Sequence, residues 1–241
     1  MHNGCHCTAD PTPPLLLLLC SHTLQTVDAV NSKLLYVCEG LTANANEISS
    51  GVAPSQQDSS ISLAQAFSLS SRPESKFKIF LDFDGHSTVG TSWNAALGQS
   101  VIVTPPYDKD GIPATFSPNE LSDIVAVWRE VSEDYAMFDV DITTADPGAA
   151  LIGNGIRVAI GGSYNDWYGR PAGGVAYVNS WGWSSQEPCF IFPQNLGPNW
   201  APYMAAAASH EVRGRLQVGG HTNSTHLTNI HKCAHQLCLS Y

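Results

Sequence analysis

The sequence has few charged residues and very few basic ones. Of its 241 residues only 13% are charged, with 11 Lys and Arg against 21 Asp and Glu, and the formal net charge is -10. Lysine is missing between Lys109 and Lys232. Nucleic acids and anionic membrane surfaces bind proteins through clustered basic side chains, so we expect neither as a partner.

Long apolar runs near the start of the chain are also missing. Residues 15–19 are five consecutive leucines, which is too short for a membrane span. No Lys or Arg precedes Lys33, so the basic residue that usually precedes the apolar part of a signal peptide is missing as well. The sequence therefore predicts no membrane span and contains little of a secretion signal.

Cysteine is missing from residues 39–188. The seven cysteines lie near the two ends of the chain, and their odd number and irregular spacing argue against a disulfide framework. Cys189 begins the apolar run 189–192, which predicts a buried thiol that packs like a small hydrophobic residue.

The composition divides the chain into three parts. Residues 1–75 have few core-forming patterns, and residues 44–71 are rich in Ser, Ala and Gln, which predicts a poorly ordered leader and linker. Apolar patterning begins abruptly at Lys76 and continues to about Val212, which predicts one folded domain over 76–212. Residues 213–241 have no periodic apolar pattern, so we expect a disordered tail there.

Five short segments within 76–212 have the pattern of β-strands. They are residues 77–83, 101–103, 138–143, 156–160 and the glycine-led segment 173–178. Strict alternation in 138–143 buries one face, so Asp139 and Asp141 are expected to face solvent.

A helix is predicted from Pro118 to about Tyr135. Ser117 precedes Pro118 and stands three residues before Glu120, the spacing of a reciprocal N-terminal cap. One helix face is apolar; its residues are Leu121, Ile124, Val125, Trp128, Val131 and Tyr135. Together with a second helix that begins near residues 199–202, these elements predict an α/β or α+β fold with one sheet and packed helices.

In the second helix, an alanine-rich stretch is followed directly by Ser209, His210 and Glu211. Zinc-binding helices of the H-E-x-x-H type begin in this way. In such helices two histidines four residues apart bind the metal from one helix face, and the Glu acts as general base on the zinc-bound water.

Six stretches together resemble the catalytic domain of metzincin-type, reprolysin-like zinc metallopeptidases. They are K-I-F-L-D-F-D-G-H (78–86), 117–128, F-D-V-D-I-T-T (138–144), 156–162, 173–178 and 206–212. The resemblance implies a secreted protease with a twisted mixed sheet, His210 as a zinc ligand and Glu211 as the base. It also implies that the edge strand at 173–178 binds a peptide or protein substrate by strand addition, through Gly173, Gly174, Val175, Ala176 and Tyr177.

The resemblance breaks immediately after Val212. Position 214 is Gly where the family has its second histidine ligand, and Gln217 and Gly220 occupy the places of the turn glycine and the third histidine. If one residue is inserted after Val212, His221 falls at the third ligand's place. No methionine follows Met204, so the Met-containing turn is missing. We expect weak zinc binding and no activity as written, and a transcript spliced after Glu211 is expected to restore the missing pattern.

Two other functions fit parts of the sequence. One is a peptide-binding protein that uses the same scaffold without catalysis. The other is a phosphatase of the haloacid-dehalogenase type, in which Asp82 would be the nucleophile and Asp84 the general acid of the motif D-F-D-G. That class also needs a later lysine and an acidic pair for magnesium, and neither follows the motif in the required place.

Overall fold

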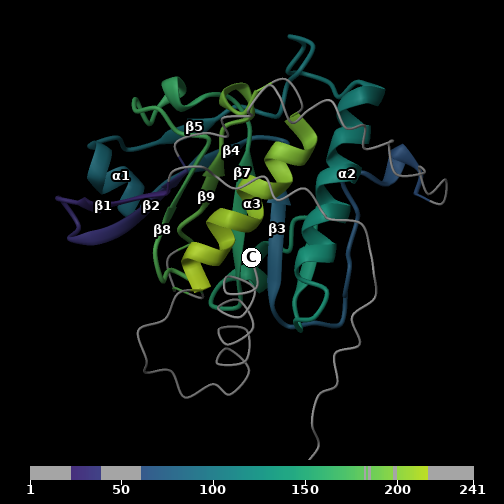
Figure 1. The fold of residues 1–241 in the computed structure, drawn as a ribbon, viewed down its shortest axis with the longest axis horizontal. Helices are drawn as coiled ribbons and strands as arrows, with labels where there is room; N and C mark the ends of the chain where they lie inside the picture. Colours follow the sequence, from purple (N-terminus) through teal and green to yellow (C-terminus); the bar gives the residue numbers. More distant parts are fainter. Residues whose placement is uncertain (1–22, 39–60, 182, 184–185, 198–199, 217–241) are drawn as a thin grey trace, which may run out of the picture.

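The fold is a mixed β-sheet with helices packed against it (Figure 1). The computed structural model describes residues 23–38, 61–181, 183, 186–197 and 200–216. The seven-stranded sheet has the order β1-β2-β8-β9-β7-β3-β6. Its strands are β1 (Thr23–Asp28), β2 (Lys33–Cys38), β3 (Lys78–Asp82), β6 (Asp141–Thr143), β7 (Gly155–Ile160), β8 (Gly174–Tyr177) and β9 (Cys189–Ile191). The prediction of one mixed sheet with packed helices is confirmed at this level.

The remaining elements are short, apart from two long helices. Strands β4 (His86–Thr88) and β5 (Ile102–Thr104) form an antiparallel pair of their own. The α-helices are α1 (Ser92–Leu97), α2 (Pro118–Asp134) and α3 (Trp200–Leu216). Among the described residues, four single 3-10 turns connect other elements: η1 (Leu63–Gln65), η2 (Gly148–Leu151), η3 (Tyr164–Asp166) and η4 (Pro193–Asn195).

The sheet is parallel at one end and antiparallel at the other. Strands β6, β3, β7 and β9 run parallel to one another, and β8, β2 and β1 continue the sheet as antiparallel neighbours. Parallel strands are usually covered on both faces, and β7 is accordingly buried along most of its length.

Helices α2 and α3 lie side by side over one face of the sheet (Figure 1). The predicted cap of α2 is confirmed, since the Ser117 hydroxyl faces the amide of Glu120 and the Glu120 carboxylate accepts the amide of Ser117 at 2.7 Å. The predicted apolar face of α2 is also confirmed. Ile124, Val125, Val131 and Tyr135 are buried in the core between α2, α3 and the sheet. The opposite face of the sheet is covered by a second core, which is largely aromatic and includes Trp93, Trp167, Tyr168, Phe190 and Phe192.

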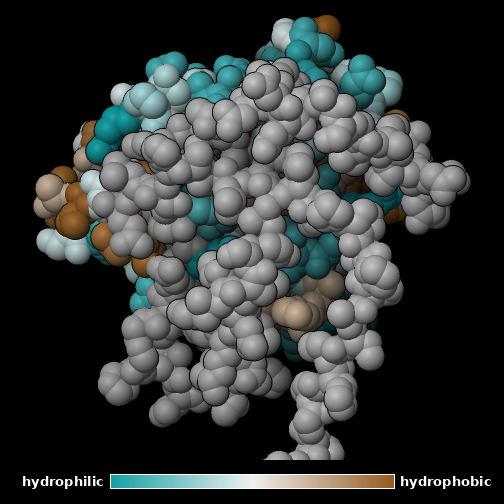
Figure 2. Space-filling model, in the orientation of Figure 1, coloured by the Kyte–Doolittle hydropathy of each residue, from teal (hydrophilic) through white to brown (hydrophobic). Residues whose placement is uncertain are grey.

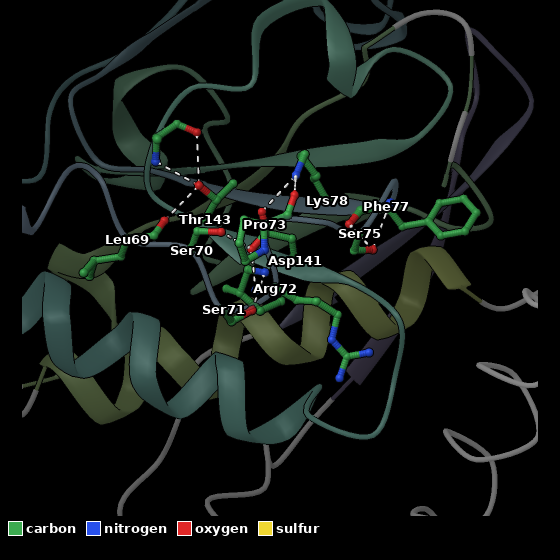
Figure 3. A network of polar contacts seen from close by, with 12 residues as sticks. Leu69, Ser70, Ser71, Arg72, Pro73, Ser75, Phe77, Lys78, Asp141 and Thr143 are labelled. Atoms are coloured by element: carbon green, nitrogen blue, oxygen red, sulfur yellow. Dashed lines mark hydrogen bonds and ion pairs between the residues drawn. The ribbon is translucent and has the colours of Figure 1, made fainter.

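Residues 61–75 are folded against β6, although the sequence predicted no structure for 1–75. Figure 3 shows the network in which Asp141 accepts hydrogen bonds from the Ser70 hydroxyl at 2.8 Å and the Arg72 amide at 3.0 Å. Lys78 forms an ion pair with the same carboxylate at 2.9 Å. Asp141 is therefore only 2% exposed, and its predicted place on a solvent-facing side is wrong. Alternation placed it on the side away from the helices but could not predict that residues 70–72 cover that side.

The structure also differs from the sequence prediction at the other end of the sheet. Residues 23–38 form the hairpin of β1 and β2, and β2 pairs with β8 along residues 174–177. The predicted edge strand is therefore an internal strand between β2 and β9. The edge is occupied by a segment that the composition assigned to the leader.

Three further expectations concern local features. Helix α3 begins at Trp200, as predicted, but it continues past Val212 to Leu216. Cys189 is completely buried in the core, as predicted. Within the part of the chain that the structure describes, no helix combines the length and the apolar character needed to cross a membrane.

Candidate functional site on helix α3

Small side chains let α3 lie close to both the sheet and α2. Alanines occupy four of its buried positions, 201, 205, 207 and 208, and Met204 and Val212 are completely buried in the same core. Alanine is also the best helix former, so this stretch forms a helix whose backbone can approach its neighbours closely. The predicted site residues His210 and Glu211 lie in the C-terminal half of α3.

Two hydrogen bonds from the end of α2 fix the residue before this pair. The Ser209 hydroxyl donates to the Asp134 carboxylate at 2.6 Å, and the Tyr135 hydroxyl donates to the Ser209 carbonyl at 3.0 Å. The sequence analysis missed this link. The only signal in the sequence for this link is that Asp134 and Tyr135 lie at the end of the predicted helix, where they can contact a neighbouring element.

The Glu211 side chain lies between α3 and β8. Glu211 is completely buried. A Cβ atom added to Gly174 would lie 3.0 Å from Glu211 Cγ and 3.2 Å from Glu211 Oε1. These separations are shorter than ordinary van der Waals contacts, so the place of the Glu211 side chain depends on the absence of a side chain at residue 174.

His210 is partly buried on the same helix. Burial, together with the positive charge of Arg213, lowers its pKa to about 4. The imidazole is therefore neutral at neutral pH, which is the form that binds a metal ion.

The described residues do not provide a zinc site around His210. Position 214, one helical turn after His210, is Gly and has no ligand atom. No group of three His, Cys, Asp or Glu side chains that could share a metal includes His210 or Glu211 among the described residues. The other predicted ligand, His221, lies outside the described residues. A structural or catalytic zinc site normally has three or four protein ligands, so this set does not fit one.

One acidic cluster does bring three carboxylates together within 4.8 Å, namely Asp108, Asp110 and Glu120. Its oxygens already accept backbone hydrogen bonds. Asp108 accepts the amide of Gly111 at 2.7 Å, and Glu120 accepts the amide of Lys109 at 2.7 Å. These contacts shape the loop before α2 and attach it to the capping carboxylate.

Asp82 is the last residue of β3, and Asp84 follows it in the bend after the strand. Asp82 is 1% exposed and forms an ion pair with Arg157 of β7. Burial, together with Asp84, raises the pKa of Asp82 to about 7, although Arg157 opposes this shift. The guanidinium of Arg157 also lies over the Phe80 ring, 4.7 Å from its centroid. Asp82 is thus surrounded by the sheet and Arg157.

The predicted substrate-binding residues are hydrogen-bonded on both sides. The Gly173 amide donates to the Cys38 carbonyl at 2.7 Å, and the Gly173 carbonyl accepts the amide of Phe192 at 2.9 Å. Gly174, Val175, Ala176 and Tyr177 are all buried. The structure therefore brings these residues next to Glu211, but a strand of the same chain lies along the edge where a peptide was expected.

No family model, no curated protein and no solved structure matches this chain. Its function is therefore inferred from the residues and geometry described above.

Proposed function

We propose that this chain has the scaffold of a zinc-dependent metalloendopeptidase of the metzincin type with an incomplete zinc site. In this proposal His210 is the remaining zinc ligand, Glu211 is the general base, and the substrate is an extended peptide or protein. We also propose that the chain belongs to the secretory pathway or the extracellular space, as the resemblance implies.

The observation that carries the proposal is the position of Glu211 beside β8. The His210–Glu211 pair lies on a helix fixed by Asp134 and Tyr135 of α2, and the Glu211 side chain contacts the backbone of Gly174. A general base for peptide hydrolysis has to lie beside the strand that holds the peptide. This arrangement supports the assignment, because β8 is the strand that the resemblance implies for substrate binding.

The described part of the chain favours weak zinc binding. A bound zinc ion would supply the activated water for hydrolysis. His210 supplies one neutral imidazole, and one imidazole gives much less affinity than three preorganised ligands. We therefore expect the chain to lack peptidase activity as written.

A peptide-binding protein without catalysis remains the second candidate. Its support is that the edge of β8 pairs with an antiparallel strand, β2, in the geometry of strand addition, and a peptide in trans would have to replace β2 there. The phosphatase has less support, since a nucleophile must reach its substrate and the Asp82 carboxylate is buried against Arg157.

Zinc titration of a restored helix tests the main proposal. Gly214→His places an imidazole four residues after His210, and Gly214→Ala is the matched control that changes helix propensity without adding a ligand. We expect Gly214→His to bind zinc at least about tenfold more tightly than Gly214→Ala, and His210→Ala to remove the gain. Equal zinc affinities of the two variants would show that α3 does not present residues 210 and 214 as a zinc-binding pair.

A further inference from the structure

We infer that β2 is a tethered internal ligand of β8, which occupies the position that an added peptide strand would take. The β1–β2 hairpin would then keep other extended peptides away from this edge until it is displaced. The idea that β2 controls access of a substrate to β8 rests on the proposed function. The replacement of β2 by another peptide strand requires neither zinc nor catalysis.

Backbone pairing between the two strands is the first observation. Strand β2 runs antiparallel to β8, with Leu35 opposite Tyr177 and Val37 opposite Val175. The Val178 amide donates to the Leu34 carbonyl at 2.9 Å. A peptide that binds by strand addition uses the same backbone groups, so β2 and such a peptide exclude each other.

Alternate side chains of β2 provide specific recognition. Leu35 is 3% exposed and Val37 is 4% exposed, and both pack in the aromatic core with Val175 and Tyr177. Side chains two residues apart point to the same face of a strand. The edge of β8 therefore fits a peptide with branched apolar residues at alternate positions.

Polar contacts hold the hairpin in this register. The Tyr177 hydroxyl donates to the Asp28 carboxylate at 2.9 Å. The ammonium group of Lys33 lies over the Trp183 ring, 4.2 Å from its centroid, and the Asn31 side-chain amide donates to the Ser92 carbonyl at 2.9 Å. These contacts come from the hairpin turn and its two flanks, so they set the register without contributing to the pairing of β8 with β9.

The C-terminal end of β2 reaches the candidate site. Cys38 lies opposite Gly174, and Gly174 is the residue whose backbone contacts the Glu211 side chain. A peptide that extends along β8 to Glu211 would take the place of Cys38. Occupation of this edge by β2 therefore covers the part of β8 nearest to the proposed base.

The hairpin lies at the end of the sheet and can leave it as one unit. In the described sheet β1 pairs with β2 alone. The Val27 residue of β1 is 63% exposed to solvent. Figure 1 places both strands at the left margin of the molecule, and Figure 2 shows apolar surface there. Departure of the hairpin breaks its pairing with β8 but leaves the pairing of β8 with β9 in place.

Hydrogen exchange of the native full chain tests whether the hairpin opens separately. The amides of Gly173 and Val178 bond to β2, whereas the amides of Gly161 and Phe192 bond to carbonyls of Ile191 and Gly173. We expect the first pair to exchange at least about tenfold faster than the second pair. Because Cys38 is disulfide-bonded, exchange is measured in the oxidised and in the reduced protein. Faster exchange in either state supports the inference, and equal protection of both pairs in both states overturns it.

Peptide competition tests whether the edge accepts a strand in trans. The probe is a labelled peptide of residues 31–38 with Ser in place of Cys38, and the control peptide also carries Leu35→Ser and Val37→Ser. The protein variant Lys33→Ala removes the contact with Trp183, and Lys76→Ala is its control at an exposed lysine of the same charge. We expect the probe to bind Lys33→Ala at least about fivefold more tightly than Lys76→Ala, with no gain for the control peptide.

Equal binding of the probe to both variants, or equal binding of the two peptides, would overturn the inference. Neither readout requires a metal ion or activity. A failed zinc titration therefore leaves the competition result valid, and a failed competition leaves the proposal for α3 intact.

Discussion

The Glu211 side chain lies where a side chain of residue 174 would begin. A Cβ atom at Gly174 would be 3.0 Å from Glu211 Cγ, and it would be equally close to Ile191 Cδ1. Packing therefore favours glycine at this position, because a Cβ atom would push against both side chains. The backbone conformation does not require glycine, because its φ is not left-handed. The contact joins the helix that carries the His-Glu pair to the strand that is paired with β2.

The first prediction is that Gly174→Ala destabilises the protein. An added methyl group forces Glu211 or Ile191 out of its place in a buried site, which costs about 1–3 kcal/mol in the free energy of unfolding. Urea denaturation measures this change. The double variant Gly174→Ala with Glu211→Ala supplies the control, because the methyl group should cost clearly less once the Glu211 side chain is shortened. An equal cost in both backgrounds would mean that the two residues are not in contact.

The second prediction concerns the link between the two long helices. Ser209→Ala removes the hydrogen bond to Asp134, and we expect a loss of about 1–2 kcal/mol in the free energy of unfolding. The pKa of Asp134 is already raised by burial, and the Ser209 hydroxyl lowers it, so this variant should raise the pKa further. Carboxyl-carbon NMR measures the pKa.

Ser122→Ala is the matched control for Ser209→Ala. Ser122 lies on α2, and its hydroxyl makes no hydrogen bond to any described residue. We expect this control to leave the Asp134 pKa unchanged. An unchanged Asp134 pKa in Ser209→Ala would show that the hydroxyl does not donate to this carboxylate in solution.

The third prediction is a pH dependence caused by Asp82. Burial and Asp84 raise its pKa to about 7 in the folded chain, above its value in an unfolded chain. Between about pH 4 and about pH 7 the folded state therefore binds more protons at Asp82 than the unfolded state does. Because of this difference, Asp82 lowers the free energy of unfolding as pH rises through the range. The slope from one group is at most about 1.4 kcal/mol per pH unit.

The variant Asp82→Asn isolates this contribution. His86 acts in the opposite direction, because burial and Arg157 lower its pKa to about 4. His86 Nδ1 lies 3.8 Å from the Asp82 carboxylate, so the pKa of His86 is measured by NMR in the wild type and in Asp82→Asn, and its contribution is subtracted from each. We expect the wild type to lose stability relative to the variant as pH rises from mildly acidic to neutral. A difference that stays constant with pH would mean that Asp82 is ionised throughout.

Local patterns predicted the elements whose residues contact near neighbours in sequence. The cap at Ser117 and Glu120 and the apolar face of α2 depend on spacings of three and four residues, and both are present. The strands near residues 78–82 and 155–160 were also predicted, because buried parallel strands have continuous apolar sequences.

The features that the sequence did not predict depend on contacts between distant segments. The hairpin of residues 23–38 has strands of only six residues, and its pairing with β8 joins Val37 to Val175 across most of the chain. Asp141 became buried because residues 70–72 cover it. Likewise, the contact of Glu211 with Gly174 has no signal in the spacing of either residue.

Hydrolysis by a chain with a restored helix tests the account most directly. The substitutions Gly214→His, Gln217→Gly and Gly220→His recreate the spacing that the metzincin resemblance implies after His210 and Glu211. We expect this variant to cleave an unfolded protein such as casein in a reaction that a chelator stops, and the added substitution Glu211→Gln to abolish cleavage. Cleavage that persists with Glu211→Gln, or no cleavage by a restored variant that is folded and binds one zinc ion, would contradict the account.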